Sequence, residues 1–294
     1  MPTLPRGSVL IALFVIVVGC TGAGPSGPPP SSSPGGGGAI EHATGPTDVL
    51  LRYDDRGGFA GPLFFASQAP IFTLCGDGRV IFRDPTEAPP PAVGGVAPNR
   101  PFRTATLSED QIQAVLRMAI DEGGLGMARL EYGYDRVADA STTTFTLNAG
   151  GLHKTVSIYA LGIATDSAPD AAARVAFAKL ARRLADFDAN GTTQTDEYVP
   201  DGYRAFLSDR DPSAGVLTRP WPWRDLMPND FVEPADSNGL RIPTRVLSVA
   251  EVEALGIDPY RGGFQRLALT GPDKLTSYSL AVRPLLPDET NKTE

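Results

Sequence analysis

Residues 142–158 read TTTFTLNAGGLHKTVSI, and this stretch decides the fold class. Apolar side chains recur at every second position, at Phe145 and Leu147 before the two glycines and at Val156 and Ile158 after them. Strict alternation is typical of strands that pack one face on a core and turn the other to water. The glycine pair suits a tight turn because glycine accepts positive φ angles. The stretch therefore predicts an antiparallel hairpin with one buried face.

A helix is predicted upstream of this hairpin, and its start is well marked. Ser108 is a suitable N-cap, and Gln111 three residues later completes a capping box. Leu107 and Ile112 flank the cap as a hydrophobic staple. The Gly123-Gly124 pair predicts the end of the helix.

Other strands and a second helix follow from the same kinds of pattern. Ile71–Cys75 and Arg79–Phe82 flank Gly76-Asp77-Gly78, which indicates a hairpin, and Asp48–Tyr53 predicts a strand. A second helix is expected from about Pro169 to Phe187. Strands with one buried face, and helices to cover it, predict an α+β fold in which antiparallel hairpins and helices form two layers.

The last third of the chain repeats part of this plan. Leu247–Val252 has the same cap, box and staple as Leu107–Ile112, and a further hairpin follows it. Either the chain contains two related halves, or both segments have converged on a common cap motif. The loop Asp188–Pro200 is the best boundary, so we expect an α+β domain over 47–188 and a smaller α+β half over 189–294.

The amino terminus predicts export. Met1–Ser8 is polar with one positive charge, and Val9–Val18 is an unbroken apolar run. A membrane-spanning helix needs ~20 apolar residues, so this run has instead the length of a signal-peptide core. Val17-Val18-Gly19-Cys20 resembles the lipobox of bacterial lipoproteins. The resemblance implies that the signal peptide 1–19 is removed and that Cys20 carries lipid with fatty acyl chains such as palmitate. The alternative is an ordinary secretory signal that happens to end at a cysteine.

Residues 20–46 predict a disordered tether. Nearly every residue from Thr21 to Gly38 is Gly, Pro or Ser, a composition that cannot form a core. We therefore expect a protein held on the cell membrane or outer membrane by covalent lipid, with its folded part outside the cytoplasm.

Charge and cysteine content narrow the class of protein further. The chain carries 26 basic and 34 acidic side chains, a net charge of −8, and a nucleic-acid partner is not expected because no basic footprint is visible. With Cys20 lipidated, Cys75 is the only thiol left, so an intrachain disulfide is not expected. Cys75 ends an apolar run, which predicts that it is buried.

One segment resembles the calcium loop of EF-hand proteins. Its acidic and amide side chains have the spacing of that loop, at Asp186, Asp188, Asn190 and Glu197. The resemblance implies a calcium ligand set, but Thr193 replaces the usual aliphatic residue and Pro200 would break the exit helix. The simpler interpretation is an acidic, turn-prone loop, with no metal and no other cofactor.

Both tryptophans lie in Arg219–Arg224, which reads RPWPWR. The alternating prolines favour an extended backbone from which Trp221 and Trp223 project. Exposed, the two indoles could stack on sugar rings or on a partner's prolines; buried, they would seal the contact between the halves. Burial is the more usual state of tryptophan.

No catalytic residue is predicted. The only histidines are His42, in the tether, and His153, beside a turn, so no histidine pair for zinc is expected, and a nucleophile elbow, a P-loop and a dinucleotide fingerprint are absent from the sequence. Asp135 and Asp139 precede the Thr-rich strand and are expected to cap turns.

These observations predict a non-catalytic lipoprotein domain that binds a protein or glycan partner or has a structural role in the envelope. The folded region is similar to uncharacterised secreted bacterial proteins, a resemblance that implies no particular function. The alternative is a carboxylate-dependent hydrolase acting on envelope glycans.

Overall fold

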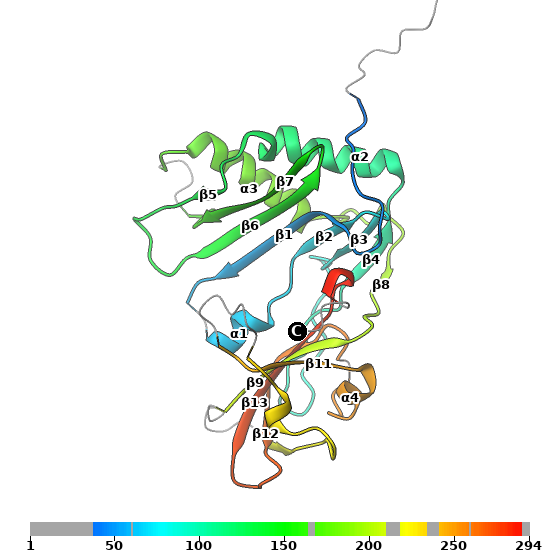
Figure 1. Cartoon of the computed structure of the whole chain (residues 1–294), viewed down its shortest axis with the longest axis vertical. Coiled ribbons are helices and arrows are strands. Elements are labelled where there is room, and N and C mark those ends of the chain that lie inside the picture. The colour runs from blue at the N-terminus through cyan, green and yellow to red at the C-terminus, as the bar shows by residue number, and fades with distance from the viewer. Residues whose placement is uncertain are drawn as a thin grey trace, which may run out of the picture. The chain divides into compact units, whose positions relative to one another are not determined.

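Two β-sheets with helices on their faces make up the folded unit, Ala39–Glu294, of the computed structural model (Figure 1). The structure describes residues 38–59, 61–163, 168–209, 218–233, 241–258 and 260–289. The predicted α+β fold is confirmed. The predicted signal peptide, Cys20 and most of the predicted tether lie outside the described residues.

The first sheet has eight strands in the order β5-β7-β6-β1-β2-β3-β4-β8. Neighbours are antiparallel except β5 and β7, which are parallel. The strands are β1 (Val49–Gly57), β2 (Phe72–Cys75), β3 (Arg79–Phe82), β4 (Arg103–Thr106), β5 (Glu131–Tyr132), β6 (Ser141–Ala149), β7 (Leu152–Tyr159) and β8 (Asp196–Glu197). The hairpins predicted at Gly76–Gly78 and at Gly150-Gly151 are both confirmed as β2–β3 and β6–β7.

Helices α2 (Glu109–Arg117) and α3 (Ala171–Ala185) cover one face of this sheet. Ser108 caps α2 through the expected box: its Oγ accepts from Gln111 N–H at 3.4 Å, and Gln111 Oε1 accepts from Ser108 N–H at 2.8 Å. The helix continues as a π-helical turn, Met118–Glu122, before Gly123. Phe187 follows α3 rather than ending it, and its ring inserts between those of Phe72 and Phe82. The core expected from the alternating pattern forms here, because the inward residues of β6 and β7 pack against both helices.

The second sheet has five strands in the order β10-β12-β13-β9-β11. They are β9 (Tyr203–Ser208), β10 (Thr218–Pro220), β11 (Thr244–Leu247), β12 (Phe264–Thr270) and β13 (Ser277–Pro284). Ser248 caps the short helix α4 (Val249–Glu253) with the predicted box, since Ser248 Oγ accepts from Glu251 N–H at 3.2 Å and Glu251 accepts from Ser248 N–H at 2.7 Å.

The two sheets share part of their arrangement. Starting from the strand before each capped helix, the first runs β4-β3-β2-β1-β6-β7-β5 and the second β11-β9-β13-β12-β10. Each ends in a hairpin followed by a parallel edge strand, but the inner hairpin strand comes first in the chain in the first sheet (β6 before β7) and second in the other (β13 after β12). The edge strands differ in chain position, because β5 comes just before its hairpin whereas β10 comes before β11. The edge strand is therefore not part of a simple repeat.

The sheets are not cleanly separated along the sequence. Helix α1 (Pro62–Ser67), from the first part of the chain, packs on the second sheet, with Leu63 and Ala66 against Phe206. Val96 lies in the second core, whereas β8 joins the first sheet. The predicted division into 47–188 and 189–294 thus follows the sheets only approximately, because segments from each part cross to the other.

The fold also begins earlier than the sequence predicts. Ile40 N–H donates to Gln113 Oε1 at 2.8 Å, and Gln113 Nε2 donates to Ile40 C=O at 2.9 Å. Gly150 N–H donates to Glu41 C=O at 2.7 Å, next to a bridge between His42 and Ala149. Residues 39–46 of the predicted tether therefore belong to the folded unit. The Gly, Pro and Ser residues before them gave no sign that Ile40 packs on the first core.

The last described turn, Pro287–Glu289, connects the two sheets. Arg52 of β1 forms a bidentate pair with Asp288, with N–O distances of 2.6 and 3.1 Å. Arg283 of β13 forms a bidentate pair with Glu289 at 2.7 and 2.8 Å. One acidic turn therefore pairs with an arginine from each sheet.

Candidate functional site

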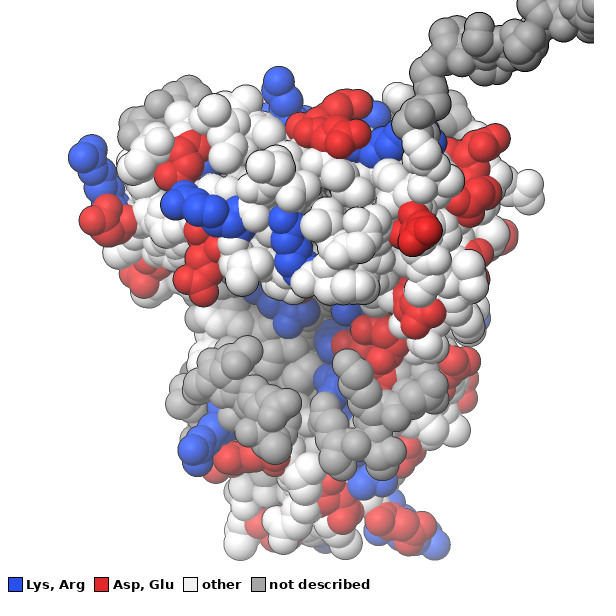
Figure 2. Space-filling view, turned by 45° about the horizontal axis from the view of Figure 1, so that its top comes forward, with Lys and Arg blue, Asp and Glu red and all other residues white. Residues whose placement is uncertain are grey.

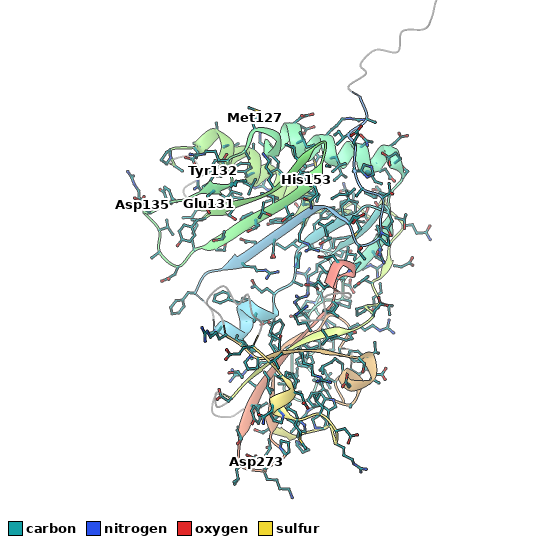
Figure 3. The ribbon with its side chains drawn as sticks, viewed as in Figure 1. Met127, Glu131, Tyr132, Asp135, His153 and Asp273 are labelled. Carbon is teal, nitrogen blue, oxygen red and sulfur yellow. The ribbon has the colours of Figure 1, made fainter. Side chains whose placement is uncertain are left out.

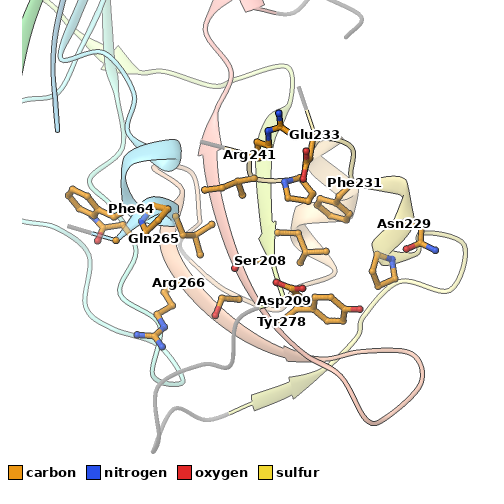
Figure 4. Close-up of a pocket in the computed structure, with 18 residues that line it drawn as sticks. Phe64, Ser208, Asp209, Asn229, Phe231, Glu233, Arg241, Gln265, Arg266 and Tyr278 are labelled. Atoms are coloured by element: carbon orange, nitrogen blue, oxygen red, sulfur yellow. The ribbon is translucent and has the colours of Figure 1, made fainter. Parts of the chain in front are cut away.

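A cavity of about 1150 Å³ opens beside the second sheet, where the start of α1 meets the end of β9 and the start of β13 (Figure 4). Six short segments line it: Gly61–Phe64, Leu207–Asp209, Pro228–Glu233, Arg241–Pro243, Gln265–Arg266 and Tyr278–Ser279. No two of these segments are adjacent in sequence, so only the folded chain forms the site.

Local backbone features place the polar side chains of the cavity. The β12–β13 register shifts between Phe264 and Leu267, so Gln265 and Arg266 form a bulge and are both exposed. Asp209 follows the end of β9, and Asn229 lies in the 3-10 turn Pro228–Asp230. Asp209 and the Gln265–Arg266 pair therefore lie where a regular strand stops or is interrupted, and Asn229 lies in a turn.

The polar side chains of this cavity are free to accept a ligand. Within the described part of the chain, six of them have no hydrogen-bond or ion-pair partner: Asp209, Asn229, Glu233, Arg241, Gln265 and Arg266. They supply two carboxylates, two guanidinium groups and two amides. A concave surface with a few convergent polar groups is the usual form of a binding site.

The aromatic wall of the cavity continues into the tryptophan pair. Tyr278 and Phe231 line the cavity, and their rings lie 5.8 and 6.3 Å from that of Trp221. Trp221 and Trp223 lie 5.0 Å apart, edge to face, and their indole N–H groups donate to Leu226 C=O and Glu251 C=O. Both indoles are half-buried in the second core. They therefore support the cavity wall from behind rather than project as a free platform.

The calcium candidates do not converge. Asp188 accepts from Thr193 N–H at 2.7 Å, and Glu197 lies in β8, paired with Arg261 at 3.3 Å. Across the described residues, no three His, Cys, Asp or Glu side chains gather closely enough to hold a metal ion. Asp186 and Asn190 lie in the turn after α3, so the segment has the form of a polar turn.

The two histidines, distant in sequence, line one smaller cavity of about 780 Å³ at the end of the first sheet. His42 is already engaged, with Nδ1 2.8 Å from Ala43 C=O and Nε2 3.2 Å from Glu109. Asp288, also on this wall, pairs with Arg52. His153 is exposed beside the β6–β7 turn (Figure 3). Most of the charged groups that line this smaller cavity therefore already have partners within the protein.

Other acidic groups have structural partners. Asp54 pairs with Arg56, and Asp55 accepts from Thr143, so the adjacent carboxylates point to opposite faces as expected for a strand. Burial raises the pKa of Asp54, and the charge of Arg56 opposes that effect. Asp139 adopts φ 54°, in keeping with its predicted place in a turn, and Asp135 is exposed at the far edge of the first sheet (Figure 3).

Cys75 is fully buried, as its apolar surroundings predict. Burial raises the pKa of its thiol to about 11, so little reactive thiolate forms near neutral pH.

Sequence reasoning missed the cavity. Its residues form no motif, and the only available signals were the Gly-Pro and Asn turns and the adjacent aromatic residues.

Acidic and basic side chains are interspersed over the face shown in Figure 2. None of the helices in the described ranges combines the length and apolar character that crossing a bilayer requires.

A comparison of this chain with known protein families, characterised proteins and solved structures finds no match. The geometry of the cavity and the sequence of the amino terminus are therefore the features that bear on function.

Proposed function

We propose that this protein is a lipid-anchored extracytoplasmic lipoprotein whose folded unit binds a protein or glycan partner in the cavity beside the second sheet, without catalysis. The lipobox-like Val17–Cys20 and the Gly/Pro/Ser-rich stretch after it support the anchor. A structural role in the envelope, through a bound partner, is compatible with the same site.

One observation carries the binding proposal: six polar side chains line a single cavity and have no partner within the described chain. Polar groups in a concave site gain most from a partner that supplies matching donors and acceptors. A wall of Tyr278, Phe231 and Phe64 adds apolar surface beside them. This combination is typical of ligand sites.

The anchor is tested by labelling cells with an alkyne analogue of palmitate. We expect Cys20→Ala to abolish the label and to release the protein from the membrane fraction. Cys75→Ala is the matched control, because it removes the other cysteine and should retain both label and location. Labelling of Cys20→Ala would contradict the anchor.

The binding site is tested by photo-crosslinking in cells. A photoreactive residue at Asn229, in the cavity, should crosslink to one reproducible partner that is then identified by mass spectrometry. The same residue at Glu122, exposed beyond α2, is the control and should not recover that partner. Equal recovery from both positions, or none from Asn229, would count against this cavity.

The alternative function, a carboxylate-dependent hydrolase of envelope glycans, is favoured by one observation: Asp209 and Glu233 both line the cavity. Two carboxylates at a substrate are the minimum for acid–base glycoside cleavage. Release of soluble sugar from isolated envelopes, lost in both Asp209→Asn and Glu233→Gln, would support hydrolysis over binding alone.

A further inference from the structure

We infer that the cavity beside the second sheet recognises a short peptide segment that carries side chains of both charges. The inference rests on the proposed binding function and narrows it, because it chooses between a protein and a glycan partner. It follows from the types of side chain that the cavity leaves unpaired.

The charges of the described residues that line the cavity are balanced. Asp209 and Glu233 supply two carboxylates, and Arg241 and Arg266 supply two guanidinium groups. Figure 4 shows Arg241 near Glu233 and Asp209 near Tyr278, with Arg266 apart from both pairs. Groups of both signs therefore line the cavity, and its described residues form no patch of one sign.

This balance disfavours the main classes of glycan. A neutral oligosaccharide would cover four charged groups and supply no opposite charge, and removing an unpaired charge from water is costly. An acidic polymer would pair with the arginines but would meet two carboxylates and a chain of net charge −8. A ligand with both signs pairs every group.

The uncharged part of the lining fits a polypeptide. The amides of Asn229 and Gln265 can donate to peptide carbonyls and accept from peptide N–H groups. Phe64, Phe231 and Tyr278 offer ring surfaces for apolar side chains. At about 1150 Å³ the cavity exceeds the usual size of sites for drug-sized ligands, and so has room for several residues.

The probes are an array of hexapeptides that each contain at least one basic and one acidic residue, the same peptides with Gln at every charged position, and chitohexaose as a neutral glycan. The tightest peptide is titrated into the full-length protein by calorimetry at low and high salt. We expect a mixed-charge peptide to bind, its Gln version to bind at least about tenfold more weakly, and salt to weaken binding.

Cavity variants identify the groups responsible. Arg266→Gln and Asp209→Asn should each weaken binding about tenfold, while Lys274→Gln, exposed in the β12–β13 turn outside the cavity, should leave binding unchanged. Arg266→Glu should regain affinity for a peptide whose acidic residue is replaced by Lys. Melting curves of each variant verify folding, which these exposed positions should not disturb.

Three outcomes would overturn the inference: equal binding of charged and Gln peptides, binding of chitohexaose alone, or no array peptide above background. The first two would leave the proposed binding function standing. That function fails separately, through the crosslinking at Asn229.

Discussion

Arg174 and Arg266 show how differently the two regions of this molecule use the same kind of side chain. Arg174, on α3 above the first sheet, is fully buried and donates to the carbonyls of Tyr159, Tyr132 and Gly133 at 2.9, 3.3 and 2.7 Å. Arg266, in the bulge of β12, is exposed beside the cavity and has no partner in the described chain. One arginine satisfies backbone carbonyls of its own fold, whereas the other is available to a ligand.

The contrast extends beyond these two residues. The first sheet has two covering helices and a large apolar core, and its buried polar groups mostly find partners within the chain. The second sheet is smaller and, within the described residues, is covered by the two short helices α1 and α4 and by loops, beside which the cavity opens. The difference suggests that the first region provides stability and the second provides recognition, and four predictions test this division.

The largest effect is expected from the two arginines themselves. Arg174→Met should lower the free energy of unfolding by about 3–5 kcal/mol, because it leaves three carbonyls and Asp170 without the buried guanidinium. Arg266→Met should change it by less than about 0.5 kcal/mol. Urea unfolding measures both, and similar losses in the two variants would remove the contrast.

The next effect concerns the turn that connects the sheets. Burial alone would raise the pKa of Glu289, but the hydrogen bonds and charge of Arg283 outweigh it and lower the pKa to about 2 from 4.5. A lowered pKa in the folded state gives stability that is complete above pH 4.5 and is lost as the pH falls toward 2. The loss should be roughly 3 kcal/mol in the wild-type protein.

Unfolding measured from pH 6 to pH 2 checks this effect. Glu289→Gln should be less stable at pH 6 and should have a flatter pH dependence, whereas Glu122→Gln, at an exposed position, should follow the wild-type curve. An unchanged slope in Glu289→Gln would show that the turn does not hold the sheets together.

A smaller effect tests the similarity of the two regions. Ser108 and Ser248 have nearly identical backbone angles, φ −69° with ψ 162° and 163°, and both complete a capping box. Ser108→Ala and Ser248→Ala should therefore each cost about 1 kcal/mol, and Asp at either position should restore most of it. Unequal losses would mean that the matching caps have different roles in the two halves.

No effect is expected from calcium. Asp188 already accepts a hydrogen bond from Thr193 N–H, and Glu197, in β8, forms an ion pair with Arg261. Melting temperatures in calcium and in chelator should coincide, whereas a true site at ~100 times its dissociation constant would add ~2.7 kcal/mol. A clear rise in calcium would reinstate the EF-hand interpretation.

Local features of this fold were predictable from sequence, and distant contacts were not. The hairpin at Gly76–Gly78 and the caps at Ser108 and Ser248 depend on residues within a few positions of each other, so their patterns are complete in the sequence. The packing of α1 on the second sheet and of Ile40 on α2 depends on contacts between remote segments. No local pattern records such contacts.

The cavity was the hardest feature to predict from sequence, because it depends entirely on contacts between remote segments. Its unpaired polar residues come from four separate segments, and each one by itself is an ordinary surface residue. Only the bulge at Gln265 and Arg266 and the turn around Asn229 bring them to one place. The tryptophan pair was the nearest sequence signal, and it marks the back of the cavity wall.

The hydrogen bonds between Ile40 and Gln113 also determine where the chain enters the folded unit. They make the chain enter beside α2, at the end remote from the second sheet (Figure 1). If Cys20 is lipidated as proposed, about 18 residues of sequence separate it from this entry point. Attachment at that end would leave the opposite end, with its cavity, the freest to meet partners that approach from outside the cell surface.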